Sequence, residues 1–121
     1  MSAKNIVLHR GDVVRVRLDP VEGHEQAGVR PALVLSPDLI NEHLNVVMLA
    51  AITSKRLDIV PPFEVLLQAG EGGLKTDSKV MLMQTRSVDK RRVLSQYGSL
   101  SEQTMRKVDR ALAIAIGFTK I

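Results

Sequence analysis

The feature that most constrains the fold is a series of short apolar runs separated by glycine, proline and polar residues. Five of these runs have the length and pattern of β-strands: residues 12–18, 31–35, 46–52, 63–67 and 79–88. The runs 31–35 and 46–52 are apolar throughout, which predicts central strands covered on both faces. No strand alternates with a full-length helix, so the order of elements argues against a doubly wound parallel sheet.

One long helix is predicted near the end of the chain. Ser99 and Glu102 have the spacing of a capping box, and Gly117 suits the position after the last turn. Between them an apolar stripe is expected to face the core: Met105, Val108, Leu112, Ala115 and Ile116. A short helical turn is also expected after Ser36, with Ser36 as its cap. We therefore expect a mainly β (α+β) fold, a small, strongly bent antiparallel barrel with a C-terminal helix, in one domain of residues 1–121.

Composition narrows the classes of function. The chain has 17 Lys and Arg against 13 Asp and Glu, and the net charge of +4 favours a polyanionic partner. It has no cysteine, which excludes disulfides and cysteine-based zinc sites. Two Phe, one Tyr and no Trp leave few side chains on which bases could stack. If the partner is a single-stranded nucleic acid, hydrogen bonds would dominate its recognition and favour a short preferred sequence. Without a long apolar run or a signal-peptide pattern, the expected location is the cytoplasm.

Arg30 is the main candidate for binding a phosphate. It closes a polar stretch over residues 19–30, and Pro31 biases its backbone toward an extended conformation. A guanidinium is always charged and offers five donors in a planar fork, which suits phosphate oxygens. The alternative for a loop arginine is a surface salt bridge with Glu22 or Glu25.

Thr53 is the second candidate. Its hydroxyl, followed by that of Ser54, comes where the buried run 46–52 leaves the core, and functional groups often collect at such strand ends. The alternative is that Thr53 only bonds to nearby backbone and ends the strand.

Two further groups of polar residues could act on a phosphodiester. His24 or Glu25 could accept a proton from an attacking hydroxyl, and Gln26 beside them is a candidate for substrate binding. Gln84 and Arg86 replace apolar residues on one face of the run 79–88. They either contact the nucleic acid or mark the exposed end of that strand.

No metal ion or cofactor is expected. His9, His24 and His43 are isolated, and neither an HxH or HExxH spacing nor a tight group of carboxylates is present. A serine hydrolase is disfavoured because G-x-S-x-G is absent, and a nucleotide-binding fold is disfavoured because no glycine-rich loop joins a strand to a helix.

Three segments together resemble one family of proteins. They read RGDVVRVRLDPVEGHEQAGVRPALVLSP, VVMLAAITSK and QTRSVDKRRV, and the specific part is GHEQAGVRPALVLSP. In this order and spacing they resemble the MazF/PemK family of toxin endoribonucleases over roughly residues 10–116.

The resemblance implies an SH3-like barrel of the CcdB/MazF type and a homodimer that cuts single-stranded RNA at selected sequences without metal. The products would carry 2′,3′-cyclic phosphate and 5′-hydroxyl ends, and a cognate antitoxin would neutralise the enzyme. The functional arginine of the family falls on Arg30 and its threonine on Thr53. Glu25 matches an acidic position of the motif, and His24 matches the histidine of PemK-like members.

This sequence departs from PemK-like members on one strand. Met81 and Met83 stand where those members have an arginine and an acid. An acid or base from that strand is therefore not expected. The catalytic roles are assigned to Arg30 and Thr53, with His24 or Glu25, and Gln84 and Arg86 become candidate RNA-contacting residues.

Two other functions fit the same fold. One is a non-catalytic RNA-binding or adaptor domain, against which Arg30 and Thr53 argue. The other is a gyrase-poisoning toxin of the CcdB type, whose tail contains a tryptophan, whereas this chain has none.

Overall fold

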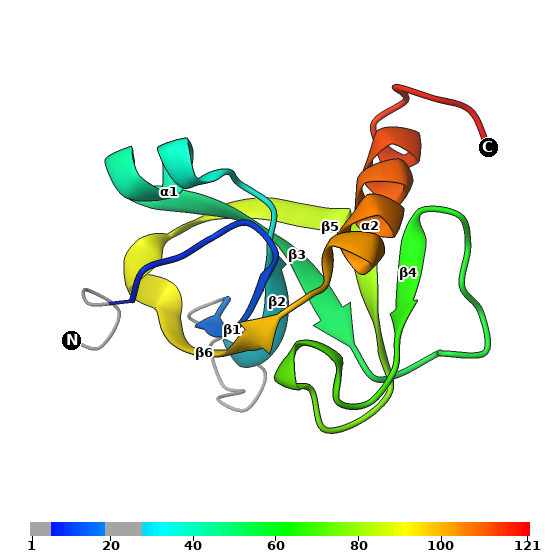
Figure 1. Cartoon of the computed structure of the whole chain (residues 1–121), viewed down its shortest axis with the longest axis horizontal. Coiled ribbons are helices and arrows are strands. Elements are labelled where there is room, and N and C mark those ends of the chain that lie inside the picture. Colours follow the sequence, from blue (N-terminus) through cyan, green and yellow to red (C-terminus); the bar gives the residue numbers. More distant parts are fainter. Residues whose placement is uncertain (1–5, 19–27) are drawn as a thin grey trace.

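Six strands form one antiparallel sheet in the computed structural model, which describes residues 6–18 and 28–121 (Figure 1). The strands are β1 (Asp12–Arg17), β2 (Val29–Val34), β3 (Val46–Thr53), β4 (Glu64–Leu67), β5 (Ser78–Asp89) and β6 (Val93–Ser99). Their order across the sheet is β4-β5-β3-β2-β1-β6. Two α-helices, α1 (Asp38–His43) and α2 (Glu102–Ala115), and two 3₁₀ turns, η3 (Glu71–Gly73) and η4 (Lys90–Arg92), complete the described elements.

All five predicted strands are present, and the two apolar runs are central as expected. The prediction that both faces of 46–52 are covered is wrong for the first half of β3, where Val46 and Met48 are exposed. The sixth strand, β6, was not predicted because its sequence VLSQYGS does not alternate clearly between apolar and polar residues.

The loop predicted over residues 19–30 is wrong at its end, and residues 19–27 lie outside the described residues. Strand β2 begins at Val29, so Arg30 and Pro31 lie in a strand rather than before one. The paired part of β2 and β3 begins only at Ala32. The missing N–H of Pro31 therefore interrupts no bond of that ladder.

Both predicted helix caps were placed on the wrong residue. Ser101, not Ser99, caps α2, since its hydroxyl accepts from the Thr104 amide. Ser99 belongs to β6 and donates its hydroxyl to Asp12 at 2.8 Å. These shifts leave the apolar stripe of α2 in place except at Ile116, which is exposed.

Ser36 does not cap α1, whose N-cap residue is Pro37. The Ser36 hydroxyl instead donates to the buried Asn41 side chain at 2.6 Å and accepts from the Met48 amide at 3.0 Å. A buried hydroxyl that is hydrogen-bonded on both sides ties α1 to β3.

Alternation on each strand divides the buried residues into two apolar clusters. The first lies between the sheet and α2, and it contains Val13, Leu33, Ile52, Val80 and Val108 among others. The second lies on the other face and contains Val14, Val16, Val34, Leu49 and Val93 among others. None of the helices in the described ranges is long and apolar enough to cross a membrane.

The turn that follows β4 brings the two ends of the sheet together. Gly73 in η3 has φ +80°, and a Cβ there would overlap the backbone carbonyl of Tyr97 in β6. A Cβ on Gly98 would in turn lie 2.8 Å from the carbonyl carbon of Gly72. Only glycine allows this backbone-to-backbone approach, which bends the sheet into a barrel-like shape without a β4–β6 ladder among the described strands.

Candidate functional site

The candidate site is a cleft of about 750 Å³ at one end of the sheet. Its walls come from the first residues of β2, the last residues of β3, the segment between β3 and β4, and the middle of β5. The described residues that line it are Leu18, Arg30, Ala32, Leu49, Ala51, Ile52, Thr53, Lys55, Arg56, Ile59, Pro61, Glu64, Lys79, Met81, Gln84, Thr85 and Arg86.

Arg30 and Thr53 line this cleft together because of the pairing of β2 with β3. Ala32 pairs with Ala51 in this antiparallel ladder, and the pairing goes no further. Arg30 lies two residues before Ala32, and Thr53 lies two residues after Ala51. Since side chains two residues apart share a face of a strand, all four residues lie on the same side of the sheet. The structure therefore brings the two main candidates to one site.

The Thr53 hydroxyl has a backbone partner. Its Oγ1 accepts from the Lys55 amide at 3.1 Å, so the local bond considered in the sequence is present. A hydroxyl also carries a proton of its own. The bond to Lys55 orients Oγ1 and leaves its O–H able to donate to a ligand in the cleft.

Gln84 and Arg86 line the cleft as a result of an irregularity in β5. The partner of Ala50 is Thr85, whereas the partner of the next residue, Ala51, is Met81. Three additional residues of β5, 82–84, are accommodated at this step as a bulge. The Thr85 hydroxyl donates to the Leu82 carbonyl at 2.7 Å across it. The bulge shifts the alternation, so that Gln84, Thr85 and Arg86 all reach the cleft.

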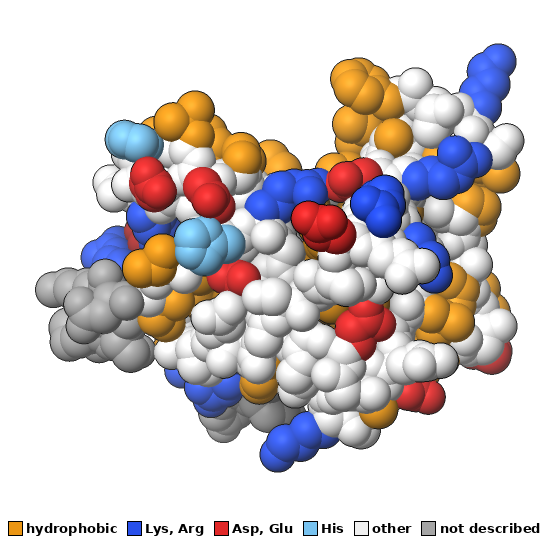
Figure 2. Space-filling model, viewed as in Figure 1, with side chains coloured by type: hydrophobic (Ala, Val, Ile, Leu, Met, Phe, Trp, Pro, Cys, Tyr) orange, Lys and Arg blue, Asp and Glu red, His pale blue; other side chains and the backbone are white. Residues whose placement is uncertain are grey.

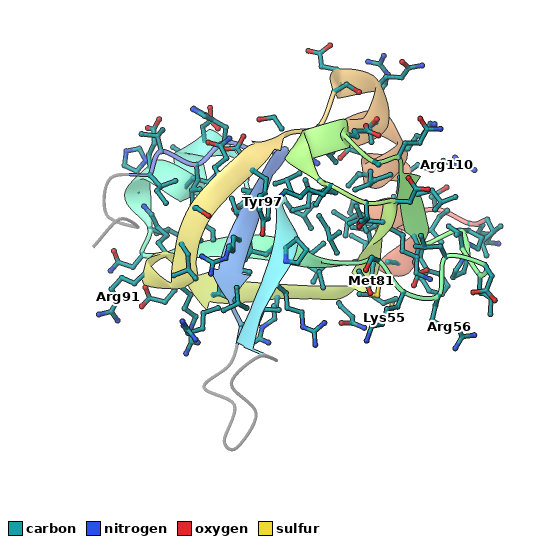
Figure 3. The ribbon with its side chains drawn as sticks, turned by 90° about the horizontal axis from the view of Figure 1, so that it is seen from below. Lys55, Arg56, Met81, Arg91, Tyr97 and Arg110 are labelled. Carbon is teal, nitrogen blue, oxygen red and sulfur yellow. The ribbon has the colours of Figure 1, made fainter. Side chains whose placement is uncertain are left out.

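Positive charge dominates the lining. Among the described residues of the lining, five cationic side chains, Arg30, Lys55, Arg56, Lys79 and Arg86, stand against one carboxylate, Glu64. Figure 3 shows Lys55, Arg56 and Met81 close together at one end of the molecule, with Arg91 at the other. No described carboxylate forms an ion pair with Arg30, which is exposed. A polyanion is the ligand that such a lining favours.

Lys79 differs from the other four cations because it is buried, at 4% exposure. Its Nζ lies 2.7 Å from Glu64 Oε1 and donates to the Arg56 carbonyl at 2.8 Å and the Ile59 carbonyl at 2.6 Å. The ammonium therefore has two hydrogen-bond acceptors and one counterion, since the buried Glu64 Oε1 makes no hydrogen bond within the described residues. Lys79 and Glu64 were not predicted as site residues from the sequence, where the available signal was a lysine at the start of an apolar strand.

The other candidates from the sequence are not all in the cleft. Ser54 is exposed and is not part of the lining. His24, Glu25 and Gln26 lie outside the described residues, as does Glu22. Among residues 6–18 and 28–121 there is no group of three His, Cys, Asp or Glu that could hold a metal ion.

Comparison with known proteins gives a consistent result. Residues 9–116 match the family model described as PemK-like, MazF-like toxin of type II toxin-antitoxin system. The chain is 38% identical to Endoribonuclease EndoA of Bacillus subtilis (strain 168) over 111 residues, which are 92% of this chain and 96% of that protein.

Solved structures agree with the family model. A MazE-MazF crystal structure from Deinococcus radiodurans matches with a TM-score of 0.77 and 32% identity, covering 95% of this chain and all of that one. A Mycobacterial endoribonuclease in complex with its cognate antitoxin has the same fold, with a TM-score of 0.76 at 24% identity over 94% of this chain and 99% of that one. The family match, the sequence identity and the fold lead to one conclusion: this chain belongs to the PemK-like, MazF-like toxins of type II toxin-antitoxin systems.

Proposed function

We propose that the cleft cuts single-stranded RNA, mRNA included, through attack of a 2′-hydroxyl on the adjacent phosphate, without a metal ion. The chain is an endoribonuclease of the MazF/PemK type. The observation that carries the proposed chemistry is the position of Arg30 and Thr53, which face one cleft from neighbouring strands. A permanently charged guanidinium and an oriented hydroxyl at one place can bind and polarise a single phosphodiester.

In the proposed mechanism Arg30 holds the scissile phosphate and stabilises the negative charge that builds on its oxygens. Charge stabilisation suits an arginine better than base catalysis, because the guanidinium keeps its proton at neutral pH. Thr53 donates its O–H to a non-bridging oxygen of the same phosphate. Both contacts strengthen as the pentacoordinate phosphorane forms, and this is the condition for lowering the barrier.

The reaction also needs a proton acceptor and a proton donor. The 2′-oxygen loses its proton and bonds to phosphorus, while the bond to the 5′-oxygen breaks and that oxygen gains a proton. Glu25 and His24 are the residues to which we assign these proton transfers. The products are a 2′,3′-cyclic phosphate and a 5′-hydroxyl.

Sequence selectivity is assigned to hydrogen bonds along the cleft. Gln84 offers an amide that can both donate and accept, and Arg86 offers a guanidinium beside it. Gln26 and Ser54 are also assigned to substrate binding. A lining without an aromatic side chain among the described residues favours hydrogen bonding over stacking.

A homodimer, a cognate antitoxin and a cytoplasmic location complete the proposal. Large hydrophobic side chains are exposed on α1, just after it, and at the start of β3, which α1 contacts: Leu39, Leu44, Val46 and Met48. Figure 2 shows hydrophobic side chains gathered over α1. This exposed apolar surface supports the proposed homodimer.

Sedimentation equilibrium tests the dimer. It should give twice the chain mass of 13.3 kDa, and a mass of one chain would contradict the dimer. The Deinococcus radiodurans relative, described as MazE-MazF, supports neutralisation by a protein partner.

The decisive experiment compares purified wild-type chain with Arg30→Ala on a long single-stranded RNA in the presence of EDTA. Wild type should cut the RNA at discrete sites, and Arg30→Ala should lose about 100- to 1,000-fold in kcat because one charge-stabilising donor is gone. Arg110→Ala, which removes an exposed arginine of α2 away from the cleft (Figure 3), should cut like wild type. Double-stranded DNA should stay intact.

A second substrate tests the attacking group. RNA with a single 2′-deoxy nucleotide at the cut position should bind with unchanged affinity and remain whole. Cleavage of that substrate would overturn the mechanism. Intact normal RNA after incubation with wild-type protein would instead favour a non-catalytic RNA-binding domain.

A further inference from the structure

We infer that Lys79 is a positioning residue that holds the segment 54–61 against the sheet, so that the exposed side chains of Lys55 and Arg56 form a wall of the cleft and bind RNA phosphates. This inference rests on the proposed function for its RNA part. Its structural part concerns the chain alone. The two parts are therefore tested by different measurements.

The contacts of Lys79 join three separate parts of the chain. Its backbone is in β5, its carbonyl partners Arg56 and Ile59 are in the segment between β3 and β4, and Glu64 is the first residue of β4. The bonds to the two carbonyls are 2.8 and 2.6 Å long. Hydrogen bonds from a charged donor in a buried place are stronger than those between neutral groups.

The pairing of β4 with β5 explains why Glu64 is the partner of Lys79. Leu66 pairs with Lys79, and Glu64 pairs with Met81, so Lys79 and Glu64 are diagonal neighbours on the same face. The Lys79 and Glu64 side chains are 5% and 13% exposed. The pair therefore neutralises its own charge and supplies no free cation to the cleft. The role left to Lys79 is to position the segment.

The held segment contains the one strained non-glycine residue of the described ranges. Arg56 has φ +57°, in the left-handed region that costs a side-chain-bearing residue about 1 kcal/mol. The Arg56 carbonyl accepts from both Lys79 Nζ and the Ile59 amide, the latter at 3.3 Å. Such a conformation persists where its surroundings hold it. Lys55 and Arg56 then line the cleft at a defined place, and the exposed Arg56 guanidinium also lies 3.8 Å from Asp58, a solvent-exposed pair that a phosphate can replace.

We call the hydrogen bonds of Lys79 Nζ with the Arg56 and Ile59 carbonyls the clamp. The variants must separate loss of the clamp from loss of the fold. Lys79→Met alone would leave the Glu64 carboxylate buried without a counterion, which can unfold a small domain. The test variant is therefore Lys79→Met combined with Glu64→Met, which removes both charges and keeps the volume. The control is Glu64→Gln, which keeps the ammonium with its two carbonyl partners and puts an amide oxygen in place of the carboxylate. Because it leaves the buried ammonium without a counterion, urea unfolding is measured for both variants and digestion is compared under conditions where both are folded.

Limited trypsin digestion tests the clamp in the absence of RNA, through the rate at which the Arg56–Leu57 bond is cut. Trypsin must attack the Arg56 carbonyl to cut the Arg56–Leu57 bond, and this is the carbonyl that Lys79 holds. In the double variant we expect this cut to be at least about tenfold faster than in wild type, since local opening exposes it. The Lys75–Thr76 bond, in another exposed loop, should be cut at an unchanged rate. In Glu64→Gln the Arg56–Leu57 bond should stay protected.

The salt dependence of RNA binding tests whether Lys55 and Arg56 contact phosphates. The probe is the RNA with a 2′-deoxy nucleotide at the cut position, and each phosphate contact contributes about 0.7 to the slope of log affinity against log salt. Losing Lys55 and Arg56 should reduce that slope by about 1.4 in the double variant, as in Lys55→Gln with Arg56→Gln. Combining all four substitutions should reduce it no further. KM for cleavable RNA should rise about tenfold with kcat nearly unchanged.

Unchanged trypsin cutting at Arg56–Leu57 in the double variant would overturn the clamp. A faster cut with an unchanged salt slope would overturn the RNA part of the inference. Wild-type protein that leaves RNA intact would overturn the proposed function, and the trypsin comparison would still decide whether Lys79 holds the segment.

Discussion

Arg30 and Thr53 occupy opposing positions on two neighbouring strands, each two residues beyond the last pair of the β2–β3 ladder. The ladder ends at Ala32 and Ala51, so the strands no longer bond to each other where these two polar side chains stand. Both side chains line the cleft. The end of a ladder is a suitable place for a ligand, because the strands below hold the positions of the side chains and no partner strand fills the space.

Thr53 offers a direct test of the hydroxyl. Thr53→Val keeps the shape of the side chain and removes the O–H, so we expect kcat to fall by about 100-fold, as for loss of a donor to a developing negative charge. Thr53→Ser keeps the hydroxyl and its bond from the Lys55 amide, and it should retain most of the activity. Single-turnover cleavage of a short RNA measures both. Equal rates for Thr53→Val and wild type would show that the hydroxyl has only its local structural role.

Gln84 tests the origin of sequence selectivity. Its side chain is exposed and lines the cleft next to the bulge in β5. Gln84→Ala should reduce the preference at one base of the cut sequence by about tenfold, the worth of one hydrogen bond, with cutting of the disfavoured sequences little changed. Sequencing of the cut ends on a randomised RNA pool gives the preference at every position. A uniform loss of cleavage over all sequences would contradict a role in reading a base.

Gly73 tests how the two ends of the sheet are joined. A Cβ at this position would overlap the Tyr97 carbonyl oxygen and lie 2.7 Å from the carbonyl carbon, at φ +80°. Gly73→Ala should therefore lower the free energy of unfolding by about 3 kcal/mol. Gly117→Ala is the matched control, since Gly117 has φ +83° and no neighbouring atom within 4 Å, and it should cost about 1 kcal/mol. Urea unfolding followed by circular dichroism measures both, and equal losses would contradict the close approach.

Asp89 gives a pH-dependent contribution to stability. Its carboxylate accepts from the side chain and the amide of Arg91, and these bonds lower the pKa of Asp89 from 3.8 to about 2. A lowered pKa in the folded state means that stability is present above the unfolded pKa, near 4, and is lost as the pH falls through about 2. Asp89→Asn should be less stable than wild type at pH 6. The two urea midpoints should converge as the pH falls toward 2.

Local sequence patterns were sufficient for most of the elements. Alternation and apolar runs indicated five of the six strands, and the stripe from Met105 to Ala115 indicated α2. Strand β6 was missed because VLSQYGS carries a weak pattern, and it is a strand through its pairing with β1. The cap of α2 was placed on Ser99 because both Ser99 and Ser101 precede the helix, and only the packing of β6 decides which is free to cap.

The residues of the candidate site could likewise be predicted only in part. Arg30 and Thr53 stood out by residue type and by their places at the ends of apolar runs. Lys79 did not stand out, since its environment depends on residues 20 and 23 positions away in the segment 54–61. Gln84 and Arg86 were expected to share one face of a regularly alternating strand, but the bulge in β5 interrupts that alternation and brings Gln84, Thr85 and Arg86 to the cleft together.

The sequence by itself determined the mainly β composition of the fold, the C-terminal helix, the basic character and the two residues at the centre of the site. These depend on periodicity and residue chemistry, which act within a few positions along the chain. Tertiary structure alone decided that Arg30 opposes Thr53, that Gly73 meets Tyr97 and that Lys79 holds Arg56 in place. Those relationships depend on strand register and on the burial of distant residues against each other, and no local pattern specifies either.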